Sequence, residues 1–151
     1  MYDRILLATD GSVASERAES HAAGLAAAHG AVLHALYVID EDVYTAYSGD
    51  EYVDEAEGPE HGLEERGAET LERVRTEAAD VDVVEVLRRG DPAGTVVDYG
   101  DEADVDLIVL GTRRRPSEYR ALLGSVTDRV LRLTARPALV VKTEADGDAE
   151  A

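Results

Sequence analysis

The chain has 151 residues, 44% of them hydrophobic, so it is long enough to bury the core of a single domain. Its 33 acidic and 15 basic residues give a formal net charge of −18, which disfavours binding to nucleic acid or to an anionic membrane. The chain has no cysteine, which excludes disulfides, and no apolar stretch long enough to span a bilayer, so we expect a cytoplasmic protein.

Strands and helices alternate along the first part of the chain. An apolar run predicts a strand over residues 4–8, and Asp10 and Ser12 follow it as candidate N-caps of a helix. The predicted inner face of that helix consists of Ala14, Ala18, His21, Ala22, Leu25 and His29. We expect His21 to be packed rather than to bind a ligand. The next apolar run predicts a second strand over residues 31–39.

The rest of the chain repeats this alternation. A second helix is predicted from apolar or small residues at helical spacing, namely Leu63, Gly67, Leu71, Val74 and Ala78. Strands over residues 81–87 and 106–110 enclose a helix that Asp91 caps and Pro92 begins. The inner face of this helix carries Ala93, Val96, Val97 and Gly100. The last helix carries Val126, Val130 and Leu133. Pro137 ends the last helix before a strand over residues 138–142.

Five short apolar strands separated by helices predict an α/β fold, a doubly wound five-stranded parallel sheet with helices on both faces. We expect one domain over residues 1–142 and an acidic, disordered tail over residues 143–151. The last strand carries an apolar run at the sheet edge, Ala138, Leu139, Val140 and Val141. An exposed apolar edge invites pairing with another chain, so residues 138–141 predict a homodimer.

The strongest functional signal lies between residues 107 and 127. An apolar strand ends at Gly111, and a helix begins near Gly124, Ser125, Val126 and Thr127. A helix start offers unpaired N–H groups and a partial positive charge, which favour an anion. The intervening arginines, Arg113, Arg114, Arg115 and Arg120, match phosphate with bidentate hydrogen bonds. Alternatively, Gly111 is a turn residue, Gly124 is an ordinary helix glycine, and the arginines form a solvated face.

Gly111, Gly124 and Ser125 resemble the nucleotide-binding pattern of the universal stress protein family: glycine, two residues, glycine, nine residues, then glycine with serine or threonine. The resemblance covers residues 1–142. It implies an adenine nucleotide alpha hydrolase-like fold and a stress-response module that binds ATP or another adenine nucleotide, with or without Mg²⁺, in the crevice between the first and fourth strands. The residues that it assigns to this site are Ala8, Thr9 and Asp10 for base and ribose, the backbone of Val38 for adenine, and Ser125, Val126 and Thr127 for phosphate. Asp10 could equally be only a helix cap.

Arg114 stands where the family pattern has its middle glycine. Arg114 or Arg113 could bond a phosphate directly, which would replace the close backbone approach that glycine permits. Alternatively, Arg114 fills the space of the outer phosphates, and the chain is a non-nucleotide-binding dimeric interaction scaffold. We favour the first interpretation. Family members resembling this chain commonly dimerise through the last strand.

Other features are less specific. No nucleophile, base and orienter arrangement is visible, so we expect at most weak ATP hydrolysis, and no metal site formed by the protein alone. Residues 40–60 form an acidic connection whose tyrosines, Tyr44, Tyr47 and Tyr52, could cover a nucleotide or pack on the protein's own surface or a partner. An acidic chain with Lys142 as its only lysine resembles proteins of halophilic archaea, so we expect added salt to stabilise it.

Overall fold

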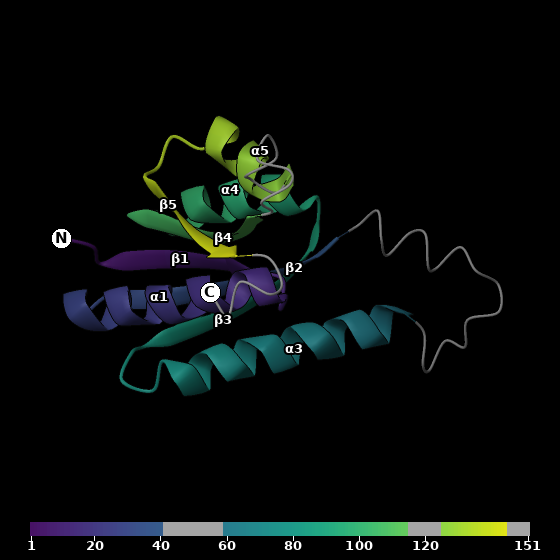
Figure 1. Cartoon of the computed structure of the whole chain (residues 1–151), viewed down its shortest axis with the longest axis horizontal. Helices are drawn as coiled ribbons and strands as arrows, with labels where there is room; N and C mark the ends of the chain where they lie inside the picture. The colour runs from purple at the N-terminus through teal and green to yellow at the C-terminus, as the bar shows by residue number, and fades with distance from the viewer. Residues whose placement is uncertain (41–58, 115–124, 145–151) are drawn as a thin grey trace.

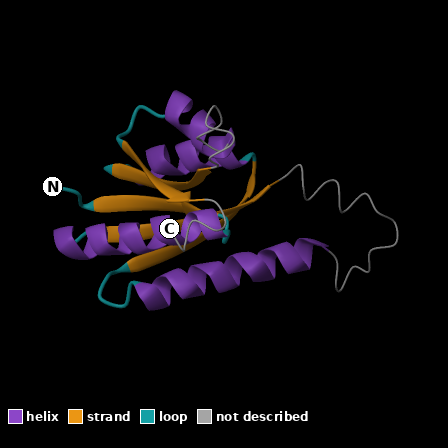
Figure 2. Cartoon of the chain, in the orientation of Figure 1, coloured by secondary structure: helices purple, strands orange, loops and turns teal. Residues whose placement is uncertain are grey.

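Strands and helices alternate through the residues that the computed structural model describes, which are 1–40, 59–114 and 125–144. The strands are β1 (Arg4–Thr9), β2 (Val32–Asp40), β3 (Val83–Gly90), β4 (Leu107–Arg114) and β5 (Ala138–Glu144). The helices are α1 (Val13–His29), α3 (Pro59–Glu77), α4 (Pro92–Ala103) and α5 (Ser125–Leu133). This order of elements confirms the predicted alternation (Figure 2). None of these described helices is both long and apolar enough to cross a membrane.

The strands form one parallel sheet in the order β3-β2-β1-β4-β5. Helices α1 and α3 cover one face of the sheet, and α4 and α5 cover the other (Figure 1). The predicted doubly wound fold is therefore confirmed. The chain moves outward from β1 through β2 to β3 and then returns to place β4 beside β1 on its other side. Strand order thus reverses between β1 and β4, which is where ligands bind in such sheets.

The central strand β1 is buried on both faces. Ile5 and Leu7 pack into the core beneath α1 and α3, whereas Leu6 packs into the core beneath α4 and α5. All three side chains are fully buried. This alternation is the period-two pattern of a strand whose two faces both carry helices.

The buried face of α1 differs from the predicted one. Its buried residues are Ser15, Ala18, Glu19, Ala22, Ala23 and Ala26. His21 is exposed, so its predicted packing is wrong, and His29 is exposed beside the ring of Tyr2. Alanines lie all around this helix and mark no clear apolar stripe, so the sequence pattern does not orient it.

All five strands run further than predicted, β1 and β2 by one residue and the other three by more. The third predicted strand, residues 81–87, is β3 at Val83–Gly90, and β4 continues past Gly111 to Arg114. Strand β5 continues to Glu144, so the predicted tail begins later, and its remaining residues 145–151 lie outside the described residues. The residues beyond the predicted ends are glycine, polar or charged, and the parallel backbone pairing continues through them, for example between Arg114 and Glu144. The tyrosines of the 41–58 connection also lie outside the described residues.

Helix α4 begins where the sequence predicts. Asp91 is its N-cap, with a carboxylate oxygen that accepts a hydrogen bond from the backbone N–H of Gly94 at 2.9 Å, and Pro92 follows it. The second oxygen of Asp91 accepts from Arg129 of α5 at 2.9 Å. The start of α4 is therefore joined to α5. Leu133, the last residue of α5, is exposed.

Candidate functional site

A cavity of about 280 Å³ opens at the carboxyl ends of β1, β2 and β4, beside the point where strand order reverses. The predicted site residues that line it are Ala8, Thr9, Asp10, Val38, Gly111, Val126 and Thr127. Residues from both ends of the chain meet here because parallel strands end at the same edge of a sheet. Ser125 begins α5 and is exposed outside this lining. Gly124 and the side chains of Arg113 and Arg114 lie outside the described part of the chain.

Apart from Val38, the apolar walls of the cavity were not predicted. Leu36 of β2 lines it together with Val38, and Pro92 and Val96 line it from α4. Period-two spacing places Leu36 on the same face as Val38, and helical spacing places Val96 one turn after Pro92. These spacings could have revealed the walls once the strand order was known.

Gly111 lies within β4 rather than at the end of that strand. The prediction that the fourth strand ends there is wrong, because Gly111 pairs with Val141 inside the β4–β5 ladder. A Cβ atom at Gly111 would lie 2.3 Å from the carbonyl oxygen of Ala14 in the first turn of α1. Glycine therefore lets α1 approach β4 closely at the wall of the cavity.

Asp10 stabilises the turn between β1 and α1. Its Oδ1 accepts hydrogen bonds from the backbone N–H of Ser12 at 2.9 Å and from the hydroxyl of Ser15 at 2.8 Å. Protein atoms around the carboxyl group exclude water, which raises the pKa of Asp10, but these hydrogen bonds outweigh that effect and hold the pKa below its usual value. Asp10 is thus ionised at neutral pH. The hydrogen bonds at 2.9 and 2.8 Å both use Oδ1 of the carboxylate.

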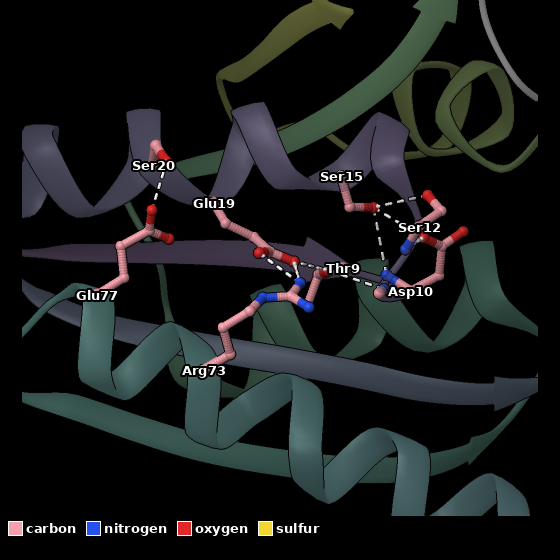
Figure 3. Close-up of polar contacts among 9 residues, drawn as sticks. Thr9, Asp10, Ser12, Ser15, Glu19, Ser20, Arg73 and Glu77 are labelled. Atoms are coloured by element: carbon pink, nitrogen blue, oxygen red, sulfur yellow. Dashed lines mark hydrogen bonds and ion pairs between the residues drawn. The ribbon is translucent and has the colours of Figure 1, made fainter. Parts of the chain in front are cut away.

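The same turn is held on its other side by Thr9. The backbone N–H of Gly11 donates to the Thr9 hydroxyl at 3.1 Å, and that hydroxyl donates to Glu19 of α1 at 2.5 Å (Figure 3). Gly11 has a φ of 77°, and a Cβ atom there would lie 2.7 Å from the hydroxyl oxygen of Thr70 in α3. The backbone of this turn is therefore fixed by contacts from both α1 and α3.

Helix α5 borders the opposite side of the cavity. Thr127 is buried, and its hydroxyl donates to the carbonyl oxygen of Gly111 at 3.1 Å, which ties the first turn of α5 to β4. Its hydroxyl hydrogen is directed at that carbonyl. Val126 is partly exposed at the cavity. The start of a helix carries N–H groups without intrahelical partners, so this side of the cavity is the one suited to an anion.

Metal-binding side chains do not gather in the described ranges, where no three His, Asp or Glu residues lie close enough together to hold an ion. The polar groups of the cavity are instead hydroxyls, backbone groups and the carboxylates of Asp10 and Asp40. Such groups can accept from or donate to the hydroxyls and ring nitrogens of an organic ligand, beside apolar walls that suit a planar ring.

The sequence is similar to those of known proteins over most of its length. Residues 1–142 match the model of the Universal stress protein family. Universal stress protein MJ0531 of Methanocaldococcus jannaschii is 33% identical over 147 residues, which cover 94% of this chain and 83% of that protein. Universal stress protein YxiE of Bacillus subtilis is 33% identical over 153 residues, which cover 94% of this chain and 100% of that protein.

Solved structures share the fold. Hypothetical protein MJ0577 of M. jannaschii has a TM-score of 0.78 at 26% identity and covers 95% of this chain and 97% of its own. A universal stress protein from Archaeoglobus fulgidus in complex with dAMP has a TM-score of 0.63 at 23% identity, covering 93% and 98%. An Arabidopsis thaliana family protein with AMP bound has a TM-score of 0.70 at 16% identity, covering 98% of both chains. Because the A. fulgidus and A. thaliana proteins are less than 25% identical to this chain, their similarity shows a shared fold and nothing more.

Proposed function

Because the chain belongs to the universal stress protein family, we propose that it binds an adenine nucleotide in the cavity at the carboxyl ends of β1, β2 and β4. The observation that carries this proposal is the composition of the cavity, in which apolar walls stand beside the ionised carboxylate of Asp10. Its volume of about 280 Å³ is near the lower end of the range for small-molecule sites. That the A. fulgidus and A. thaliana proteins hold dAMP and AMP on this fold supports the choice of ligand.

The adenine ring would lie between the apolar walls, against Leu36, Val38 and Val96. Strand β1 pairs with β2 only as far as Tyr37, whereas β2 continues to Asp40. The backbone at Val38 therefore extends past the β1 ladder at the cavity. Backbone N–H and C=O groups in that position are suited to the ring nitrogens and the amino group of adenine.

The ribose and the phosphates would occupy opposite polar sides of the cavity. An ionised carboxylate only accepts hydrogen bonds, so Oδ2 of Asp10 fits a ribose hydroxyl and repels a phosphate. The start of α5 attracts a phosphate, and the arginines that follow β4 in sequence would neutralise it. We propose ATP or another adenine nucleotide as the ligand, with or without Mg²⁺, and a cytoplasmic location.

Replacing Asp10 with asparagine should weaken AMP binding roughly tenfold, because a hydrogen bond from a ribose hydroxyl to a charged acceptor is lost. Asparagine still accepts from the N–H of Ser12, so the turn is kept. Isothermal titration calorimetry with AMP, ADP, ATP and free adenine measures the effect. Adenine lacks the ribose and serves as the matched ligand, with an expected affinity that is the same for both proteins.

Two results would contradict this account. An equal loss of adenine and AMP affinity in Asp10→Asn would show that the carboxylate supports the cavity as a whole rather than binding ribose. Failure of the unaltered protein to bind AMP, ADP and ATP would remove the proposed function. The dimeric interaction scaffold, with Arg114 closing the phosphate site, would then be the remaining function.

We also propose that the protein is a homodimer through β5. The sheet order places β5 at an edge, and Val140 is partly exposed and belongs to neither core cluster. Light scattering of micromolar protein in molar potassium chloride, which screens the net charge of −18, should give a dimer mass. Val140→Lys should give a monomer. Val84→Lys, on the opposite edge strand β3, should stay dimeric, and a monomeric unaltered protein would overturn the proposal.

A further inference from the structure

Glu19 is a carboxylate buried away from the candidate cavity. It lies on α1 with an exposed fraction of 1% and faces the end of β1 rather than solvent. Its Oε2 accepts the hydroxyl hydrogen of Thr9 at 2.5 Å. Arg73 of α3 donates to both of its oxygens, at 2.7 and 2.9 Å (Figure 3). A carboxylate this deeply buried is held in one position by these two partners.

The charge of Glu19 sets the direction of the Thr9 hydroxyl. A carboxylate can only accept, so the single hydroxyl hydrogen of Thr9 must point to Glu19. The lone pairs of that oxygen are then left to accept from the N–H of Gly11 at 3.1 Å. Gly11 has a φ of 77°, in the left-handed region that glycine reaches without strain, and this hydrogen bond helps to fix that conformation among the many open to glycine. Glu19 therefore acts on the backbone of the turn through a single hydroxyl group.

We infer that Glu19 is a positioning residue for the nucleotide site, acting through Thr9 on the turn at residues 9–11 and held in place by Arg73. This inference rests on the proposed function, because Thr9 and Asp10 of the same turn line the cavity and Glu19 does not. With the turn already formed, the carboxylate of Asp10 faces the ligand without a reorganisation cost at binding. Arg73 of α3 thereby helps to position the turn at the cavity although Arg73 does not itself line the cavity.

Glu19→Gln tests this inference with the least change in shape. Glutamine is neutral and carries both a donor and an acceptor, so the Thr9 hydroxyl is no longer obliged to donate to it. We expect AMP to bind roughly five- to tenfold more weakly, measured by calorimetry. The matched control is Ser20→Ala, which removes the 2.6 Å hydrogen bond from Ser20 of α1 to Glu77 of α3. That bond joins the same two helices without involving the turn, so AMP affinity should be unchanged.

A double-mutant cycle identifies the route of the effect. Thr9→Val removes the hydroxyl, and adding Glu19→Gln to it should weaken AMP binding no further. Additive losses would overturn the inference, because Glu19 would then act by another path. Thr9→Ser keeps a hydroxyl and should recover most of the AMP affinity that Thr9→Val loses. If Glu19→Gln does not fold, comparing the AMP affinities of Thr9→Val and Thr9→Ser still tests whether the Thr9 hydroxyl matters. Equal AMP affinities of these two variants would also overturn the inference.

Amide hydrogen exchange provides a readout that needs no ligand. The Gly11 N–H should exchange faster in Glu19→Gln than in Ser20→Ala, because its acceptor is no longer fixed. Unchanged AMP affinity in Glu19→Gln, with the unaltered protein binding AMP, would overturn this inference and leave the proposed function in place. Absence of nucleotide binding by the unaltered protein would overturn both.

Discussion

Gly111→Ala should lower the free energy of unfolding by about 3 kcal/mol, which is large for the addition of one methyl group. The added Cβ atom would lie 2.3 Å from the carbonyl oxygen of Ala14 and 3.1 Å from its carbonyl carbon. Both neighbours are backbone atoms of α1, so no side chain can rotate away to make room. The helix must move away from β4, which disrupts the core between them. Urea denaturation followed by circular dichroism measures the change.

The control for this prediction is Gly24→Ala within α1. A Cβ atom at Gly24 meets no atom within 4 Å, so the substitution adds no clash and improves helix propensity. We expect it to raise the free energy of unfolding by about 0.5–1 kcal/mol. If Gly111→Ala were as stable as the unaltered protein, α1 would not approach β4 as closely as the structure places it.

Arg73→Leu should also destabilise the protein by about 3 kcal/mol, because it leaves the buried carboxylate of Glu19 without its charged partner. Glu19 is 1% exposed, whereas the side chain of Arg73 is 45% exposed. The two single substitutions should therefore differ. Glu19→Leu leaves a guanidinium that water can reach, together with a Thr9 hydroxyl that has lost its acceptor, and should cost about 1 kcal/mol. Urea denaturation of the two single variants gives the comparison.

The double variant Glu19→Leu with Arg73→Leu isolates the unpaired charge. It should be more stable than Arg73→Leu alone, because no charge is then left buried. Arg132→Leu serves as the surface control, since Arg132 pairs with Asp128 at 3.0 Å on the exposed side of α5 and should change stability by less than about 1 kcal/mol. Equal stabilities of Arg73→Leu and Glu19→Leu would show that Glu19 is not desolvated in the folded protein.

The position of Gly111 in the structure also affects the argument for a phosphate site at the cavity. Gly111 matches the family's glycine pattern in the sequence, yet in the structure it lies inside β4 and admits the first turn of α1. The connection to α5 begins only after Arg114. A glycine at the expected spacing is thus explained by helix packing at the cavity wall, and the phosphate proposal depends instead on the start of α5 and on the arginines after β4.

Much of the fold could be predicted from local patterns. The apolar run from Ile5 to Leu7, the cap and proline at Asp91 and Pro92, and the run from Leu107 to Leu110 each indicate their element without any distant contact. Parallel strands then bring Asp10 and Gly111 to one edge of the sheet, as predicted, because every carboxyl end points the same way. Periodicity and strand direction therefore predict the edge of the sheet, whereas the neighbouring positions of the first and fourth strands followed from the resemblance to the universal stress protein family.

Only the tertiary structure decided how that site is supported. The sequence pattern of α1 could not orient an alanine-rich helix, so it placed His21 inside and did not predict that Glu19 is buried. Burial of that charge depends on Arg73, which is 54 residues away in the chain, and no local pattern encodes such a distance. The requirement for glycine at position 111 likewise comes from the backbone of Ala14, which only folding brings within contact.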